Sequence, residues 1–199
     1  MSFTWNGQTL EYLNHPYNHA KYNSRRVEVP IARWFLAQSS GVRILEVGNV
    51  LAHYGSISWP VVDLREKGAI NVNVMAWRPK TPVDLLVSIS TVEHIGFGHY
   101  GKAGQSLSIA RVLLHLRSFL SADGAALVTA PTGYNPVLDQ ELAAGTLGAD
   151  RLWAMRLRGV NDWEECSVAE ALVMGPRDCS NRWSGGLIIA LLGKLSATQ

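Results

Sequence analysis

The sequence predicts an α/β fold built around a mainly parallel β-sheet. Five short runs rich in Val, Ile and Leu follow one another: RILEV (43–47), WPVVDL (59–64), AINVNV (69–74), VDLLVSI (83–89) and AALVTA (125–130). Strands that are apolar on both faces are typical of a parallel sheet that helices cover on both sides. Two amphipathic stretches, 24–38 and 103–120, supply helices for such a cover.

Composition bounds the protein class. The 199 residues suit one core, and 47% hydrophobic and 17% charged residues indicate a globular chain. We expect an N-terminal arm over 1–22, rich in Asn, His and Tyr, and a single domain over 23–199. The net charge of +2 is spread out, which argues against a nucleic-acid partner. With no export signal and no run long enough to span a bilayer, we expect a cytoplasmic protein without a membrane partner.

The first helix is expected to begin at Ser24 or Pro30 and to end at Gln38. Proline is favoured in the first turn of a helix, so Pro30 predicts the later start. The residues that share one helical face are Val27, Ile31, Trp34 and Phe35.

The connections between the first strands are short. About eleven residues separate the first two runs, whereas a parallel crossover normally takes about a dozen or more. We therefore expect the helices after strands one to three to be reduced to about a turn.

The second half is expected to alternate helices and strands. A helix over 103–120 carries a stripe of Leu107, Ala110, Leu114 and Arg117. Later elements are a helix over 136–144, the apolar run LWAMRL (152–157), a polar loop with Trp163, a short helix near 167–173 and a closing strand over 186–194.

Ligands of parallel sheets bind beyond the carboxyl ends of the strands. The first strand ends at Glu46 and Gly48, where glycine permits a positive φ or a close approach by a ligand. Asp63 ends the second strand and can accept both hydroxyls of a ribose. Asn73 and Val74 end the third, and suit the edge of an adenine ring.

The turn after the first strand discriminates between cofactors. A dinucleotide needs a glycine-rich turn and a helix N-terminus for its pyrophosphate, and EVGNV (46–50) has one of the three glycines. S-adenosylmethionine has no phosphate, and its ammonium group can lie near a carboxylate such as Glu46. The dinucleotide interpretation is therefore the weaker one.

The segments EVG (46–48), VDLLVSISTVEHIG (83–96) and GAALVTAPTGYNP (124–136) resemble the class I S-adenosylmethionine-dependent methyltransferases, in particular small bacterial members. The resemblance implies a three-layer Rossmann-like sheet of about seven strands with the last strand antiparallel. It also implies S-adenosyl-L-methionine as cofactor. The cofactor-binding residues so implied, together with neighbours in the same turn, are Glu46, Gly48, Asn49, His53, Asp63, Asn73, Val74 and Ser90.

Methyl transfer needs aligned reactants and sometimes a base. His94, beside Glu93, is the candidate base, although a structural role at the strand end fits it equally. No metal site is expected, because GFG (96–98) breaks any helix after His94.

The loop after the fifth strand is expected to face the acceptor. Tyr134 and Asn135 can hydrogen-bond a polar acceptor there, and Trp163 completes the wall. The sequence thus predicts a methyltransferase acting on a small polar molecule, for example a sugar or a natural-product intermediate. The alternatives are an inactive methyltransferase-like fold that binds a ligand or partner and, more remotely, a nicotinamide-dependent oxidoreductase.

Overall fold

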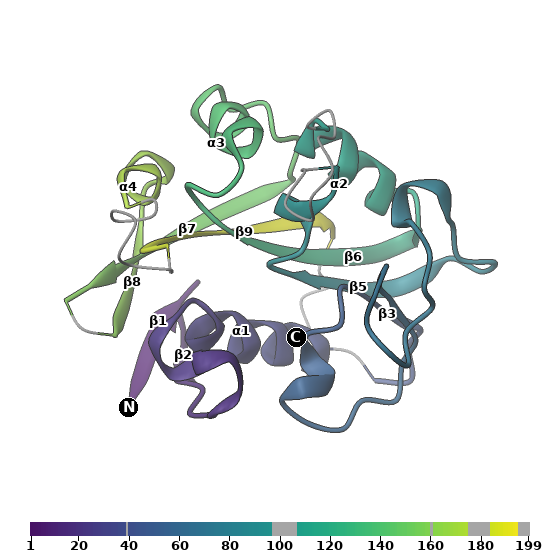
Figure 1. The fold of residues 1–199 in the computed structure, drawn as a ribbon, viewed down its shortest axis with the longest axis horizontal. Helices are drawn as coiled ribbons and strands as arrows, with labels where there is room; N and C mark the ends of the chain where they lie inside the picture. Colours follow the sequence, from purple (N-terminus) through teal and green to yellow (C-terminus); the bar gives the residue numbers. More distant parts are fainter. Residues whose placement is uncertain (39, 97–106, 160, 175–183, 195–199) are drawn as a thin grey trace.

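A seven-stranded mixed sheet forms the centre of the molecule (Figure 1). The computed structural model describes residues 1–38, 40–96, 107–159, 161–174 and 184–194. The strands, in spatial order, are β4 (Val61–Val62), β3 (Ile44–Val47), β5 (Val83–Ile89), β6 (Leu120–Pro131), β9 (Gly186–Gly193), β7 (Arg151–Arg158) and β8 (Asp162–Cys166). β4, β3, β5 and β6 are parallel, and β9 is antiparallel to both of its neighbours. The predicted α/β sheet with an antiparallel last strand is confirmed.

Two strands differ from the prediction. The run 69–74 is not a strand: it makes a single bridge, Ile70 with Val62. β4 is only two residues long and Asn71 caps the loop by donating to the carbonyl of Asp63, so no ladder can extend there. The polar loop predicted around Trp163 is instead β8, which forms a hairpin with β7 and supplies the seventh strand.

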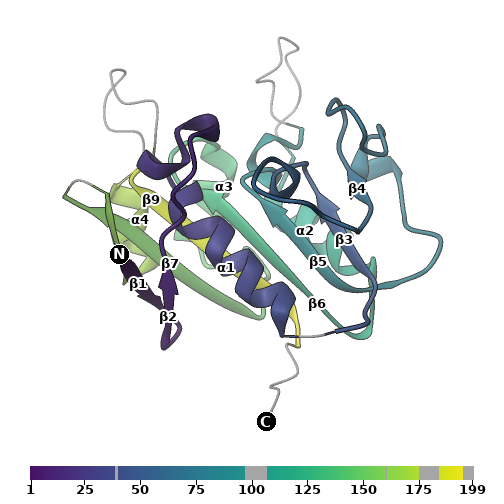
Figure 2. The same ribbon diagram turned by 90° about the horizontal axis from the view of Figure 1, so that it is seen from below.

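Helices cover both faces of the sheet, as three layers require (Figures 1 and 2). α1 (Arg25–Ala37) lies on one face, whereas α2 (Ile109–Arg117), α3 (Pro136–Ala143) and α4 (Val168–Val173) lie on the other. Successive side chains of a strand point to opposite faces of the sheet and so contribute to two separate cores. Val87 packs on the α1 side and Leu86 on the α2 side. Burial on both faces explains why these strands are apolar throughout.

α1 begins after Ser24, the earlier of the two expected starts, and not at Pro30. It starts at Arg25 and holds Pro30 in its second turn. Proline cannot donate to the carbonyl four residues before it, that of Arg26. That carbonyl accepts a hydrogen bond from the backbone N–H of Leu13 instead, at 3.0 Å. The broken helical bond thus becomes a tether for the N-terminal segment.

α2 also differs from its prediction. The described helix begins after Ser108, whose side chain caps it, and residues 103–106 lie outside the described ranges. The buried face is formed by Ile109, Val112, Leu113 and Leu116. Leu114, predicted to lie on the buried stripe, is 67% exposed. The predicted stripe was counted from Leu107, which precedes the helix, so it lies about one residue away from the face that is buried.

The first 22 residues hold more structure than an extended arm. β1 (Ser2–Trp5) and β2 (Gln8–Glu11) form a hairpin, and a 3₁₀ segment, η1 (Tyr17–Tyr22), follows. Trp5 is buried and packs edge-on against Trp34 of α1 and Trp153 of β7. The hairpin therefore belongs to the core on the α1 side of the sheet.

The helices after the first strands are reduced, as predicted. A single 3₁₀ turn, η2 (Leu51–His53), follows β3, and another, η3 (Val74–Ala76), precedes β5. A third, η4 (Val92–His94), follows β5. These short turns leave the carboxyl ends of β3, β4 and β5 open to a cavity. None of the helices in the described part of the chain is long and apolar enough to cross a membrane.

Candidate functional site

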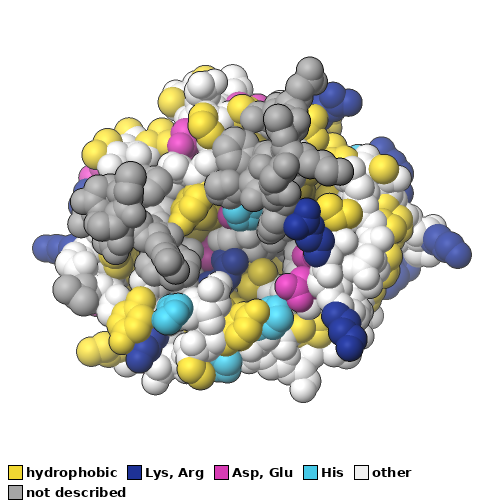
Figure 3. Space-filling view, viewed as in Figure 1, with side chains coloured by type: hydrophobic (Ala, Val, Ile, Leu, Met, Phe, Trp, Pro, Cys, Tyr) yellow, Lys and Arg dark blue, Asp and Glu magenta, His cyan; other side chains and the backbone are white. Residues whose placement is uncertain are grey.

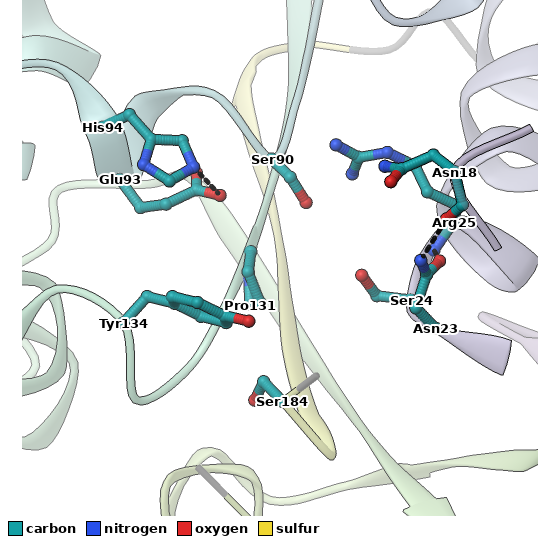
Figure 4. Close-up of a pocket in the computed structure, with 10 residues that line it drawn as sticks. All are labelled: Asn18, Asn23, Ser24, Arg25, Ser90, Glu93, His94, Pro131, Tyr134 and Ser184. Carbon is teal, nitrogen blue, oxygen red and sulfur yellow. Dashed lines mark hydrogen bonds and ion pairs between the residues drawn. The ribbon is translucent and has the colours of Figure 1, made fainter. Parts of the chain in front are cut away.

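Two adjoining cavities lie at the carboxyl ends of the parallel strands. The larger, of about 510 Å³, is bordered by the turns after β3, β4 and β5. The smaller, of about 190 Å³, lies between α1 and the loops after β5 and β6 (Figure 4). Both are bordered by Asn18, Arg25, Ser90 and His94. Charges of both signs and several histidines are interspersed near the centre of the face shown in Figure 3.

Gly48 follows β3 directly and forms the tight turn that borders the larger cavity. Its φ is +87°, a conformation that side chains disfavour. A Cβ atom built on it would lie 2.0 Å from Thr91 Oγ1, in the loop after β5. Both the backbone conformation and the close approach of Thr91 therefore require glycine here, and Gly48 lines the larger cavity.

Glu46 lies beneath the turn instead of in a cavity. Its carboxylate is fully buried, and Oε1 accepts hydrogen bonds from the N–H groups of Val50 at 2.8 Å and Leu51 at 2.7 Å. Trp59 Nε1 donates to Oε2 at 3.3 Å. Burial raises the pKa of Glu46, and these hydrogen bonds oppose that rise. The residue predicted to contact the cofactor thus shapes the turn from below.

Asp63 borders the larger cavity at the end of β4. Its Oδ1 accepts from the N–H groups of Arg65 at 2.8 Å and Glu66 at 2.9 Å. Its Oδ2 accepts from the N–H of Asn49 at 3.2 Å, which joins the second strand end to the first turn. Asn49, predicted to bind the cofactor, lines the same cavity.

The far wall of the larger cavity is partly apolar. Val74 lines it, together with Val62 and Val72. Asn73, predicted to face the ligand with Val74, instead caps η3 by accepting from the N–H of Met75 at 3.0 Å. Asn73 does not line either of the two cavities.

His53 lies at the rim of the same cavity, against the N-terminal segment. Its ring stacks on that of Tyr17, with centroids 4.3 Å apart. Its Nε2 lies 3.8 Å from Glu66 Oε2. The side chain predicted to line the pocket therefore also joins the first twenty residues to the β3 turn.

A buried ionic cluster lies under the junction of the two cavities. Glu28 of α1 is fully buried, and its Oε2 lies 2.6 Å from Arg25 Nη1. Its Oε1 accepts from Ser90 Oγ at 2.7 Å and from Thr129 Oγ1 at 2.6 Å. The cluster fixes Ser90, whose φ of +38° is unusual for a residue other than glycine.

Glu93 and His94 follow β5 and border the smaller cavity (Figure 4). Glu93 is 1% exposed, and His94 Nε2 lies 3.6 Å from its Oε1. Burial raises the pKa of Glu93 to about 8, and the nearby charge of Glu28 adds to the rise. His94 is a third exposed and borders both cavities.

The predicted acceptor residues separate in the structure. Tyr134 lines the smaller cavity, and burial, with the charge of Glu93, raises its pKa. Asn135 is fully buried: it caps α3 and donates from Nδ2 to the carbonyl of Glu93 at 2.8 Å. Trp163 lies in the core on β8, away from the lining of both cavities.

The N-terminal part contributes a wall of both cavities that the sequence pattern did not predict. Asn18 in η1 and Arg25 on α1 border both cavities, and Glu28 holds Arg25 in place. The spacing of Arg25 and Glu28, three residues apart on a helix, was the available signal. Within the described ranges, no three His, Cys, Asp or Glu side chains gather as a metal site would require.

Comparisons with known proteins give structural similarity only. No model of a known protein family and no curated protein matches the chain. An S-adenosylmethionine-dependent methyltransferase from Thermotoga maritima is 11% identical over 82% of this chain and 95% of its own, with a TM-score of 0.42. One from Mesorhizobium loti is 14% identical over 82% and 96%, with a TM-score of 0.40. We therefore infer the function from the cavities themselves.

Proposed function

We propose that the protein binds S-adenosylmethionine in the larger cavity and transfers a methyl group to a small polar acceptor in the smaller one. Bound there, the cofactor would supply a methyl group activated by its sulfonium. The chain then has to align the acceptor, exclude water and remove a proton where the acceptor carries one.

One observation carries this proposal: the N–H groups of the β3 turn are already used by acids. Glu46 accepts from Val50 and Leu51, and Asp63 accepts from Asn49. A pyrophosphate needs such N–H groups free, and it would face the Asp63 carboxylate at the cavity wall, with the buried Glu46 carboxylate beneath the turn. A ligand carrying a sulfonium and an ammonium suits this electronegative turn, so a dinucleotide is disfavoured.

The remaining residues of the larger cavity fit the other parts of the cofactor. Within the described part of the chain Asp63 Oδ2 accepts a single hydrogen bond, from the N–H of Asn49 at 3.2 Å, and retains a lone pair for a ribose hydroxyl. Val72 and Val74 offer an apolar surface of the kind that an adenine ring packs on. The volume of about 510 Å³ lies within the usual range of ligand pockets.

The shared border of the cavities supports transfer between two ligands. His94 and Ser90 face both spaces, so a donor on one side and an acceptor on the other would meet beside them. The ionic cluster of Glu28 holds Ser90 in its unusual conformation. Rigid support of this kind is what alignment requires.

The direct test is calorimetric titration with S-adenosylhomocysteine, with NADH as the comparison ligand. Binding of S-adenosylhomocysteine at micromolar concentration, without binding of NADH, is the expected result. Preferential binding of NADH to the folded protein would refute the proposal.

Asp63→Asn gives a sharper version, with Asp123→Asn as its matched control. Asp123 is exposed on β6 and lines neither cavity. We expect Asp63→Asn to weaken S-adenosylhomocysteine binding roughly ten- to a hundredfold, through loss of about 1.5–3 kcal/mol. The control should bind like the wild type. Equal affinity of both variants would remove Asp63 from the ribose site.

A second function is favoured by one observation: Glu46 and Asp63 already hold the turn. If both are wholly structural, the fold would be a ligand- or partner-binding module without catalysis. A folded wild-type protein that binds neither S-adenosylhomocysteine nor NADH would favour this second function.

A further inference from the structure

Glu93 is a buried carboxyl group that accepts no hydrogen bond from any other residue in the described ranges. It is 1% exposed, and neither of its carboxylate oxygens accepts a hydrogen bond from the described residues. It lines the smaller cavity and not the larger one. Figure 4 shows its carboxylate beside the His94 ring and across the cavity from Arg25. A buried polar group of this kind is costly and calls for a partner.

The nearest fixed cation is already neutralised. The Arg25 guanidinium pairs with Glu28 at 2.6 Å, and Glu28 accepts two further hydroxyl hydrogen bonds. The cluster of Arg25 and Glu28 therefore carries no net charge. Among the described residues that line the smaller cavity, Glu93 is the acid without an arginine or lysine partner, and its ion-pair neighbour is His94, at 3.6 Å. An anionic acceptor would face this carboxyl group, whereas a cationic one would complete it.

We propose that the smaller cavity binds a small amine as its ammonium, through a charge-assisted hydrogen bond to Glu93, and that this amine is the methyl acceptor. The inference rests on the proposed function, and it narrows the acceptor from a small polar molecule to an amine. Other polar side chains that line the cavity, among them Tyr134 and Asn18, border the space around the amine.

The Glu93 carboxylate also removes the repulsion between the ammonium of the acceptor and the sulfonium of the cofactor. An ammonium beside a sulfonium is repelled and has no lone pair with which to attack. Glu93 takes one proton from the ammonium, leaving a neutral amine. The nitrogen lone pair then bonds to the methyl carbon as the carbon–sulfur bond breaks and its electron pair stays on sulfur. The products are a methylated ammonium, a thioether and the protonated Glu93.

The groups that face Glu93 fit this proton transfer. Glu28 on α1 raises its proton affinity, and Arg25 on the same helix lowers it. His94 lies beside it on η4, and the hydroxyl of Tyr134 is close enough to feel its charge. With its pKa near 8, Glu93 is mostly protonated at pH 7 before an amine binds, and pairing with an ammonium releases that proton.

The test compares benzylamine with benzyl alcohol, which share their shape and differ in charge. Ligand-observed NMR titration of the wild type at pH 7 should show benzylamine binding at least about tenfold more tightly. Calorimetry in two buffers of different ionisation enthalpy should show about one proton released per benzylamine bound. Equal or tighter binding of benzyl alcohol, or no proton release, would overturn the inference.

Two variants test whether the benzylamine preference and the proton release arise at Glu93. Glu93→Gln should abolish both the preference for benzylamine and the proton release. Glu11→Gln, at an exposed ion pair with the N-terminus, should retain both. If Glu93→Gln keeps the preference, the amine does not pair with Glu93.

Titration with S-adenosylhomocysteine keeps the two proposals separate. Its binding together with a missing benzylamine preference overturns the amine site and leaves the proposed function standing. A benzylamine preference without S-adenosylhomocysteine binding supports the amine site and overturns the proposed methyl transfer.

Discussion

Gly48→Ala tests whether the β3 turn needs glycine for conformation alone or also for space. Gly68 provides a matched control, because its φ is also +87° and a Cβ there would meet nothing within 4 Å. Alanine at either position incurs the backbone penalty of about 1–2 kcal/mol. At Gly48 the new methyl group also collides with Thr91 Oγ1, which adds about 1–3 kcal/mol of overpacking.

Urea denaturation of both variants measures the difference. We expect Gly48→Ala to lose about 1–3 kcal/mol more unfolding free energy than Gly68→Ala. For a chain of this size, each kcal/mol corresponds to about 2–4 °C in Tm. Gly48→Ala should also weaken S-adenosylhomocysteine binding, whereas Gly68→Ala should not. Equal losses of stability would show that Thr91 does not confine the turn.

Three further predictions concern the ionic cluster, Glu93 and the N-terminal hairpin. Glu28→Ala leaves Arg25 buried without its partner, so denaturation should show a loss of about 3–5 kcal/mol. The raised pKa of Glu93 means that the folded protein binds a proton that the unfolded chain releases between pH 4.5 and about 8. Relative to Glu93→Gln, the wild type should therefore lose about 1.4 kcal/mol per pH unit as the pH rises through this window; a flat difference would contradict the assignment. Trp5→Ala should cost about 3–5 kcal/mol by opening a cavity against Trp153, and a loss under about 1 kcal/mol would mean that the hairpin folds independently of the core.

The sheet could be predicted because burial on two faces leaves a clear apolar pattern. The runs at 43–47, 83–89 and 125–130 are strands in the structure for that reason. The run at 69–74 has the same composition but no partner strand long enough to pair with. Conversely, Trp163 lies in a strand whose other residues are polar because β8 is the edge of the sheet. Whether a segment forms a strand depended in both cases on the neighbouring strand available for pairing, which the residues of a single run do not reveal.

The site was predictable where a strand end positions a residue directly. Gly48, Asp63, Ser90 and His94 follow their strands and border the cavities. Glu46 has a side chain on the buried side of its strand end, and so bonds the turn from beneath. The contribution of Asn18 depends on a non-local contact, since the chain around it is held by residues far away in the sequence. The pattern of residues around Asn18 does not indicate contacts with residues far away in the sequence.

The tether at Leu13 and the hairpin contacts have a consequence for synthesis on the ribosome. The Tyr12 hydroxyl accepts from the backbone N–H of Trp163 at 2.8 Å, and Trp5 packs on Trp153. The hairpin residues therefore leave the ribosome before β7 and β8, about 150 residues later in the chain, and have to wait for these strands before they can dock. At about 5–20 residues per second, that delay is on the order of ten seconds. Until it ends, the N-terminal segment is held only through contacts such as those of Leu13 with Arg26 and of Tyr17 with His53, so the strand-end turns of the nascent chain form before the N-terminal hairpin can dock.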